Sequence, residues 1–127
     1  MLKQVSILII SSIILIFSGL WEIKYIDNSS RYLLSDIQYS KNALKNNNFD
    51  LAKNHVENLE NTWKDIKVVW NMFVLQDEID DIDSVIATYK IHTEYDNLEE
   101  SMIDCDLLNK MIQDVVQKHK IKYENII

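Results

Sequence analysis

The chain divides into an apolar first stretch and a longer part in which apolar residues recur at helical spacing. From Val5 to Trp21, 17 residues carry no charge. Beyond Trp21, apolar positions follow one another at alternating steps of three and four residues, which is the period of one face of a helix. Charged and amide side chains fill the opposite faces, and no segment of similar length alternates at period two. The pattern therefore predicts an all-α protein.

Four stripes of this kind predict four helices, which we draw at residues 28–46, 49–72, 77–92 and 96–124. Short connections make consecutive helices antiparallel, so we expect an up-down-up-down bundle whose C-terminal end returns toward the apolar stretch. The stripes are Ile26, Ser30, Leu33, Ile37, Ser40 and Leu44; Ala52, Val56, Leu59, Trp63, Ile66, Trp70 and Phe73; Leu75, Ile79, Ile82, Ile86 and Tyr89; and Leu98, Met102, Cys105, Leu108, Ile112, Val115, His119 and Ile126.

Polar residues mark the predicted helix ends, because the chain has no proline and one glycine. The run 46–48 consists of asparagines, which adopt left-handed and capping conformations, and Asn48 is the predicted N-cap of the second body helix. Asp77 and Asp80 place acids in the first turn of the third. Asp96 is predicted to cap the fourth. At residues 27–30 the pattern fits either a helix that continues from the apolar stretch or a new start.

The apolar stretch has the length and flanks of a membrane span. As a helix, its 17 residues extend about 25 Å, near the lower end for crossing a hydrocarbon core. Trp21 and Tyr25 follow it, and their amphipathic rings are typical of the headgroup level. A cleaved signal peptide is the first alternative, but Ile16-Phe17-Ser18 is a poor cleavage site, and a helix buried in a soluble core is the second. We expect residues 1–26 to form an uncleaved signal anchor that crosses the cytoplasmic membrane once, through residues 5–21.

The charge balance limits the function further. Thirteen basic against 20 acidic residues give a net charge of −7, the wrong sign for a nucleic-acid-binding protein. An acidic surface also disfavours direct binding to anionic lipid. The basic residues on the two sides of the span are nearly balanced, but the short basic start favours an N-terminus inside the cell. Residues 27–127 are then a helical bundle outside the cytoplasm.

Two tryptophans are the first candidates for an interaction. Trp63 and Trp70 lie seven residues apart on the same stripe as Phe73. In a core their indole N–H groups need acceptors. On a surface the same rings are a platform for a sugar or another ring compound. Their ideal buried positions favour the core.

An acidic run is the second candidate. Its five carboxylates within residues 77–83 resemble a cation site. An EF-hand loop, however, needs a glycine at its sixth position, and this run has isoleucines at 79 and 82 and no glycine. The simpler interpretation is a helix start with a solvated face, and the alternative is a weak divalent-cation or partner-docking site that includes Glu78 and Asp81. Trp63, Trp70, Glu78 and Asp81 are the candidate interaction or polar-network residues.

The remaining reactive side chains predict no catalytic, metal or cofactor site. His55, His92 and His119 lie on three different predicted helices and lack the spacing of a two-histidine helix motif. The lone Cys105 excludes an internal disulfide and a multi-cysteine zinc site, and its stripe position favours a packed small hydrophobe over a nucleophile.

Several short motifs add a family resemblance. They are the apolar N-terminus, Asn48-Phe49-Asp50-Leu51-Ala52-Lys53, Glu60-x-x-Trp63, Trp70-x-x-Phe73 and Glu78-Ile79-Asp80-Asp81-Ile82. With them the chain resembles the domain-of-unknown-function family 4363, short N-terminally anchored helical proteins of low-GC Gram-positive bacteria. The resemblance covers nearly the whole chain. It implies a small membrane-associated helical domain without an assigned activity, cofactor or catalytic residue.

We therefore expect a non-enzymatic interaction or structural module at the outer face of the cytoplasmic membrane, with a protein partner. One alternative is a ligand-sensing bundle, which needs a membrane partner to transmit a signal because only residues 1–4 precede the span. A less favoured alternative is a metal-dependent enzyme that uses Glu78 and Asp81, with His55 or His92 as a further candidate.

Overall fold

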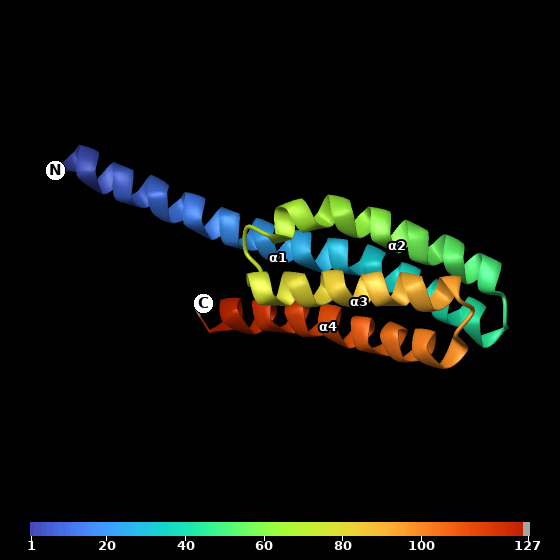
Figure 1. The fold of residues 1–127 in the computed structure, drawn as a ribbon. Coiled ribbons are helices and arrows are strands. Elements are labelled where there is room, and N and C mark those ends of the chain that lie inside the picture. The colour runs from blue at the N-terminus through green and yellow to red at the C-terminus, as the bar shows by residue number, and fades with distance from the viewer. Residues whose placement is uncertain (126–127) are drawn as a thin grey trace.

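The all-α prediction is confirmed. A computed structural model of the chain describes residues 1–125, so the stripe position predicted at Ile126 lies outside the described residues. The helices are α1 (Leu2–Lys45), α2 (Phe49–Trp70), α3 (Gln76–Glu94) and α4 (Leu98–Glu124). They form the predicted antiparallel bundle, in which α1 and α3 each pack against α2 and α4 (Figure 1).

Helix α1 runs without a break from the apolar stretch into the bundle. The Ser29 hydroxyl donates to the Tyr25 carbonyl at 2.6 Å and the Ser30 hydroxyl donates to the Asp27 carbonyl at 2.7 Å. Both hydroxyls thus bond to the preceding turn of the same helix instead of capping a new one. The separate helix start predicted at residue 28 is therefore wrong, and the continuous alternative is correct.

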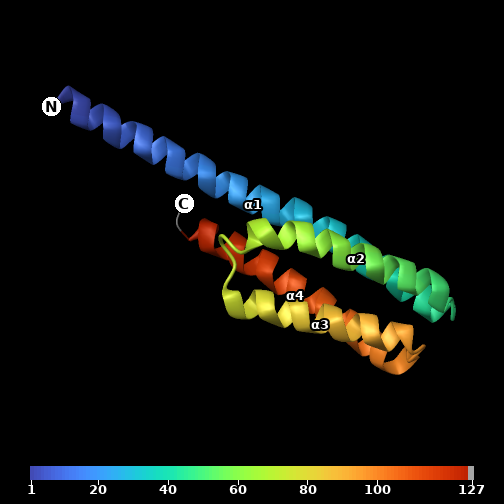
Figure 2. The ribbon, with the colours of Figure 1, turned by 45° about the horizontal axis from the view of Figure 1, so that its top comes forward.

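The bundle has two different ends (Figures 1 and 2). At one end lie the α1–α2 and α3–α4 connections, which we call the far end. At the other, α1 leaves the bundle beside the α2–α3 connection and the described end of α4, as the loop lengths predict. We call this the stalk end, and residues 2–18 of α1 the stalk.

Both far-end connections use left-handed residues that are not glycine. Asn47 has φ 56° and Asp96 has φ 55°. Asn48 caps α2 as predicted, because its Oδ1 accepts from the Leu51 N–H at 3.2 Å. In α4 the capping oxygen is Asn97 Oδ1, which accepts from the Glu100 N–H at 3.2 Å. The predicted cap at Asp96 is wrong by one residue, because Asp96 supplies the left-handed turn after α3 and only the next residue can cap α4.

The core follows the predicted stripes and joins all four helices. Leu33, Leu59, Ile79 and Leu108 are fully buried, one from each helix. Two predicted stripe positions are exposed instead, Leu75 directly before α3 and Leu98 at the start of α4. Both lie at a helix start, next to a connection.

The stalk projects from the bundle and is not part of its core (Figure 1). By length and composition, α1 is the helix of the described chain that could cross a membrane. Only 6% of its most apolar window is buried. The alternative of a helix buried in a soluble core is therefore wrong for these residues. Burial in α1 begins at Gly19.

Candidate functional site

The two candidate tryptophans lie in the core and contact each other. Trp63 is 2% exposed and Trp70 is 0% exposed. Their rings meet edge to face, with centroids 5.5 Å apart and planes at 89°. The Trp70 indole N–H donates to Ser29 Oγ on α1 at 2.8 Å, and the Trp63 indole N–H donates to Asp83 Oδ1 on α3 at 2.6 Å. Both indoles thus have the acceptors that burial requires.

Asp83 connects α3 to α2 through hydrogen bonds, a role that was not predicted from its place in the acidic run. Its Oδ1 accepts from Trp63, and its Oδ2 accepts from Lys67 Nζ at 2.6 Å. Two features of the sequence could have indicated this role. Asp83 lies next to the buried stripe residue Ile82, and its helix follows the one that carries Trp63, whose indole N–H needs an acceptor. Asp83 is a bridging residue, whereas the sequence pattern shows it only as one of the five acidic residues in the run.

The acidic run does not converge on one point. Glu78 forms an ion pair with Lys118 of α4, and this contact raises the pKa of the Lys118 ammonium. Asp83 turns toward α2, whereas Asp77 and Asp81 are exposed. Within residues 1–125, no group of three His, Cys, Asp or Glu side chains lies close enough together to hold a metal ion.

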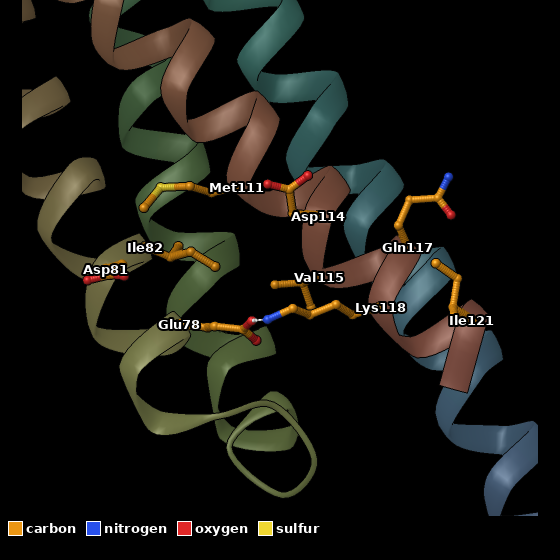
Figure 3. Close-up of a pocket in the computed structure, with 9 residues that line it drawn as sticks. All are labelled: Glu78, Asp81, Ile82, Met111, Asp114, Val115, Gln117, Lys118 and Ile121. Atoms are coloured by element: carbon orange, nitrogen blue, oxygen red, sulfur yellow. Dashed lines mark hydrogen bonds and ion pairs between the residues drawn. The ribbon is translucent and has the colours of Figure 1, made fainter. Parts of the chain in front are cut away.

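Glu78 and Asp81 line a groove between α3 and α4, which we call the α3–α4 groove (Figure 3). Its volume is about 360 Å³. Ile82 and Val115 are its buried residues, and carboxylate, amide and ammonium groups stand around them. The lining residues are Glu78, Asp81, Ile82, Met111, Asp114, Val115, Gln117, Lys118 and Ile121. The fold thus brings two of the four candidates to one surface and leaves the two tryptophans in the core.

His119 is a buried connector at the stalk end. Its Nδ1 lies 2.9 Å from the Val115 carbonyl oxygen. Its Nε2 lies 3.2 Å from the Phe73 carbonyl oxygen and 3.4 Å from Glu22 Oε1. The ring therefore joins α4 to the α2–α3 connection and to α1, in agreement with its stripe position.

The other two histidines have surroundings of their own. His92 Nδ1 lies 2.5 Å from Asp104 Oδ2, between α3 and α4. His55 stacks on Tyr39, with ring centroids 5.4 Å apart. Each of the three histidines has separate neighbours.

Cys105 behaves as a core residue. It is buried, and its thiol donates to the Ile37 carbonyl at 3.7 Å. Burial raises the pKa of the thiol and also raises the pKa of the buried Tyr89 hydroxyl, which lies 2.5 Å from Ser40 Oγ. A reactive cysteine needs a lowered pKa and access to solvent, and Cys105 has neither.

The comparison with known families agrees with the resemblance drawn from the motifs. Residues 20–126 match the family described as "Domain of unknown function (DUF4363)". The chain belongs to this family. The matched region of DUF4363 begins one residue after Gly19, where α1 enters the bundle. No curated protein and no solved structure matches the chain.

Proposed function

We propose that this DUF4363 protein is a membrane-anchored, non-enzymatic helical module that binds a protein partner at the outer face of the cytoplasmic membrane. The observation that carries the proposal is the contrast along α1. An exposed stalk, uncharged from Val5 onward, continues directly into a bundle whose core is filled. Such a stalk needs an apolar environment, and the bundle does not supply it.

The stalk supports an anchor better than a removable signal. The α1 residues just beyond the stalk contact the bundle, because Gly19 is buried and the Trp21 ring contacts Phe73. The nearest cleavage triplet, Ile16-Phe17-Ser18, fits poorly. The basic Lys3 on the short side favours an N-terminus inside and a bundle outside.

The α3–α4 groove is the surface that we expect the partner to contact. Apolar Met111 and Ile121 lie beside the charged rim. Lys118 balances the charge of Glu78, whereas Asp81 and Asp114 add two further negative charges. This combination fits a partner segment with both apolar and basic side chains.

The candidate residues for ligand sensing and catalysis have structural surroundings instead. Trp63 and Trp70 have buried rings and engaged N–H groups, which is unlike a stacking platform. Glu78 is paired with a lysine, and the thiol of Cys105 is buried. These groups have structural partners.

The location is tested with a membrane-impermeant maleimide on intact cells that express Tyr95→Cys or Lys3→Cys. Tyr95 lies exposed at the far end, and the unsubstituted protein controls for the buried Cys105. We expect labelling of Tyr95→Cys in intact cells and of Lys3→Cys only after permeabilisation. The reverse pattern contradicts the proposed orientation.

The partner surface is tested by chemical crosslinking in membranes. We expect a crosslinked partner species with the unsubstituted protein and its loss when Asp81→Lys and Asp114→Lys are combined. Glu57→Lys with Asp65→Lys is the matched control, since it makes the same charge change at exposed positions of α2. Equal crosslinking of both double variants contradicts the groove as the partner surface, and crosslinks to no protein contradict the module itself.

A further inference from the structure

The α2–α3 connection differs from the two far-end connections in its exposed side chains. Asn71-Met72-Phe73-Val74-Leu75 carries no charge. Met72 is 72% exposed and Leu75 is 66% exposed. The far-end connections, residues 46–48 and 95–97, instead expose asparagines, an aspartate and the amphipathic Tyr95, and they contain no aliphatic side chain. Exposed apolar side chains that gather in one uncharged segment are typical of a surface that contacts a membrane or a partner.

This connection is held at the level where α1 leaves the bundle. The Phe73 ring contacts the Trp21 ring edge to face, with centroids 6.0 Å apart. Trp21 in turn stacks on Tyr25 at 5.4 Å. The Phe73 carbonyl lies 3.2 Å from Nε2 of the buried His119. The connection is therefore fixed to both α1 and α4.

The level of Trp21 is also the level expected for the membrane surface. Trp21 closes the uncharged segment that begins at Val5, and aromatic rings at the end of a span occupy the headgroup region. A segment that contacts Trp21 lies at the same depth. Figures 1 and 2 show the α2–α3 connection beside α1 at this point, at the stalk end of the bundle.

We propose that the α2–α3 connection is a second membrane contact, with Met72 and Leu75 inserted among the lipid headgroups next to the α1 span. This inference rests on the anchor proposed above. The contact is apolar and not electrostatic, because the segment is uncharged and the exposed Asp77 follows it closely. Two attachments hold the bundle with its stalk end on the lipid surface, and they direct the α3–α4 groove along the membrane plane.

The test uses the full chain in phosphatidylcholine vesicles with a polarity-sensitive fluorophore at one cysteine. Met72→Cys and Leu75→Cys report on the connection, Ile14→Cys on the stalk and Tyr95→Cys on the far end. All four positions are exposed, so labelling leaves the core intact, and the unsubstituted protein controls for Cys105. Quenching by lipids with a nitroxide near the headgroup measures contact with the bilayer.

We expect a blue-shifted emission and strong nitroxide quenching at Met72 and Leu75, and neither at Tyr95. If Ile14 is quenched by a nitroxide deep in the acyl chain while Met72 and Leu75 resemble Tyr95, the second contact is overturned and the anchor stands. If Ile14 is also unquenched, the anchor itself fails. A blue shift at Met72 without lipid quenching shows that protein covers the connection, from a second copy or a partner, and overturns the inference as well.

Discussion

The two halves of α1 have the same secondary structure and opposite surroundings. Over residues 2–18 the apolar side chains stand on every side of the helix and are exposed. Over residues 19–45 one stripe of apolar side chains is buried, as Leu33 and Ile37 show, while Tyr32 and Tyr39 on other faces are exposed. Helix formation is therefore common to both halves. The distribution of apolar residues around the axis decides which half enters the bundle and which needs another apolar solvent.

The serines of α1 also differ between the two halves in their hydrogen bonds. Ser12 donates to the Leu8 carbonyl at 2.8 Å, and Ser29 donates to the Tyr25 carbonyl at 2.6 Å. Ser29 also accepts from the Trp70 indole, so it joins two helices. In the stalk a hydroxyl satisfied within its own helix is what a bilayer requires.

The largest expected effect comes from placing two lysines in each half. Ile9→Lys with Ile13→Lys should move the protein from the membrane fraction to the soluble fraction, because a lysine near the centre of a span costs about 2.5–3.5 kcal/mol. Tyr32→Lys with Tyr39→Lys, at exposed positions of the second half, should leave it in the membrane fraction. Cell fractionation measures both. If both double variants distribute equally between the membrane and soluble fractions, the two halves of α1 do not differ in their contact with the membrane.

A leucine truncation in each half should differ by several kcal/mol. Leu33→Ala should lower the free energy of unfolding by about 2–5 kcal/mol, since it leaves a cavity in the core. Leu8→Ala should change it by less than about 0.5 kcal/mol, because Leu8 is exposed. Chemical denaturation in mild detergent, followed by tryptophan fluorescence, measures both. A comparable loss at Leu8 would show that the stalk is packed by protein.

Truncating one serine in each half compares how much their hydrogen bonds contribute to stability. Ser29→Ala should cost about 1–3 kcal/mol, because the buried Trp70 N–H loses its acceptor. Ser12→Ala should cost almost nothing. In a double-mutant cycle, Trp70→Phe should make Ser29→Ala much less costly, since the donor is then gone as well. Additive losses would contradict the hydrogen bond as the cause.

The smallest expected effect is a fall in the stability of the bundle at high pH, which comes from two groups that contact the second half of α1. Burial raises the pKa of Cys105 and of Tyr89, so the folded state keeps protons that the unfolded chain releases from about pH 8.5 and about pH 10. Stability is complete below these values and falls as pH rises above them, by at most about 1.4 kcal/mol per pH unit for each group. Denaturation at pH 7, 9 and 10 measures the slope. Cys105→Ala should reduce the slope between pH 9 and 10, and an unchanged slope would contradict the assignment.

Much of the fold could be predicted because the decisive signals are local. Leu59, Leu108 and their stripe neighbours repeat at the helical period, so the pattern alone placed them in the core. The predicted helix boundaries were wrong where the same residue type fits two different backbone positions. Serines 29 and 30 have the composition of a helix start, and yet their hydroxyls bond back along α1. Asp96 and Asn97 are both capping residues by type, and only the path of the chain decides between them.

The candidate site was predictable only in part. The sequence indicates that Trp63 and Trp70 need acceptors, but the acceptors lie 20 and 41 residues away, on α3 and α1. The ion pair between Glu78 and Lys118 likewise crosses 40 residues. The assignment of Trp63, Trp70, Glu78 and Asp81 as interaction or polar-network residues stays a prediction.

The sequence by itself determined the helices, their buried stripes, the apolar stalk and the family, because each of these depends on residues close together along the chain. The tertiary structure alone decided that α1 is continuous, that Asp83 bridges two helices, and that Phe73 meets Trp21 at the base of the stalk. Such contacts depend on the rotation and axial offset of each helix against its neighbours. Those are set by the packing of the whole core, which no local pattern contains.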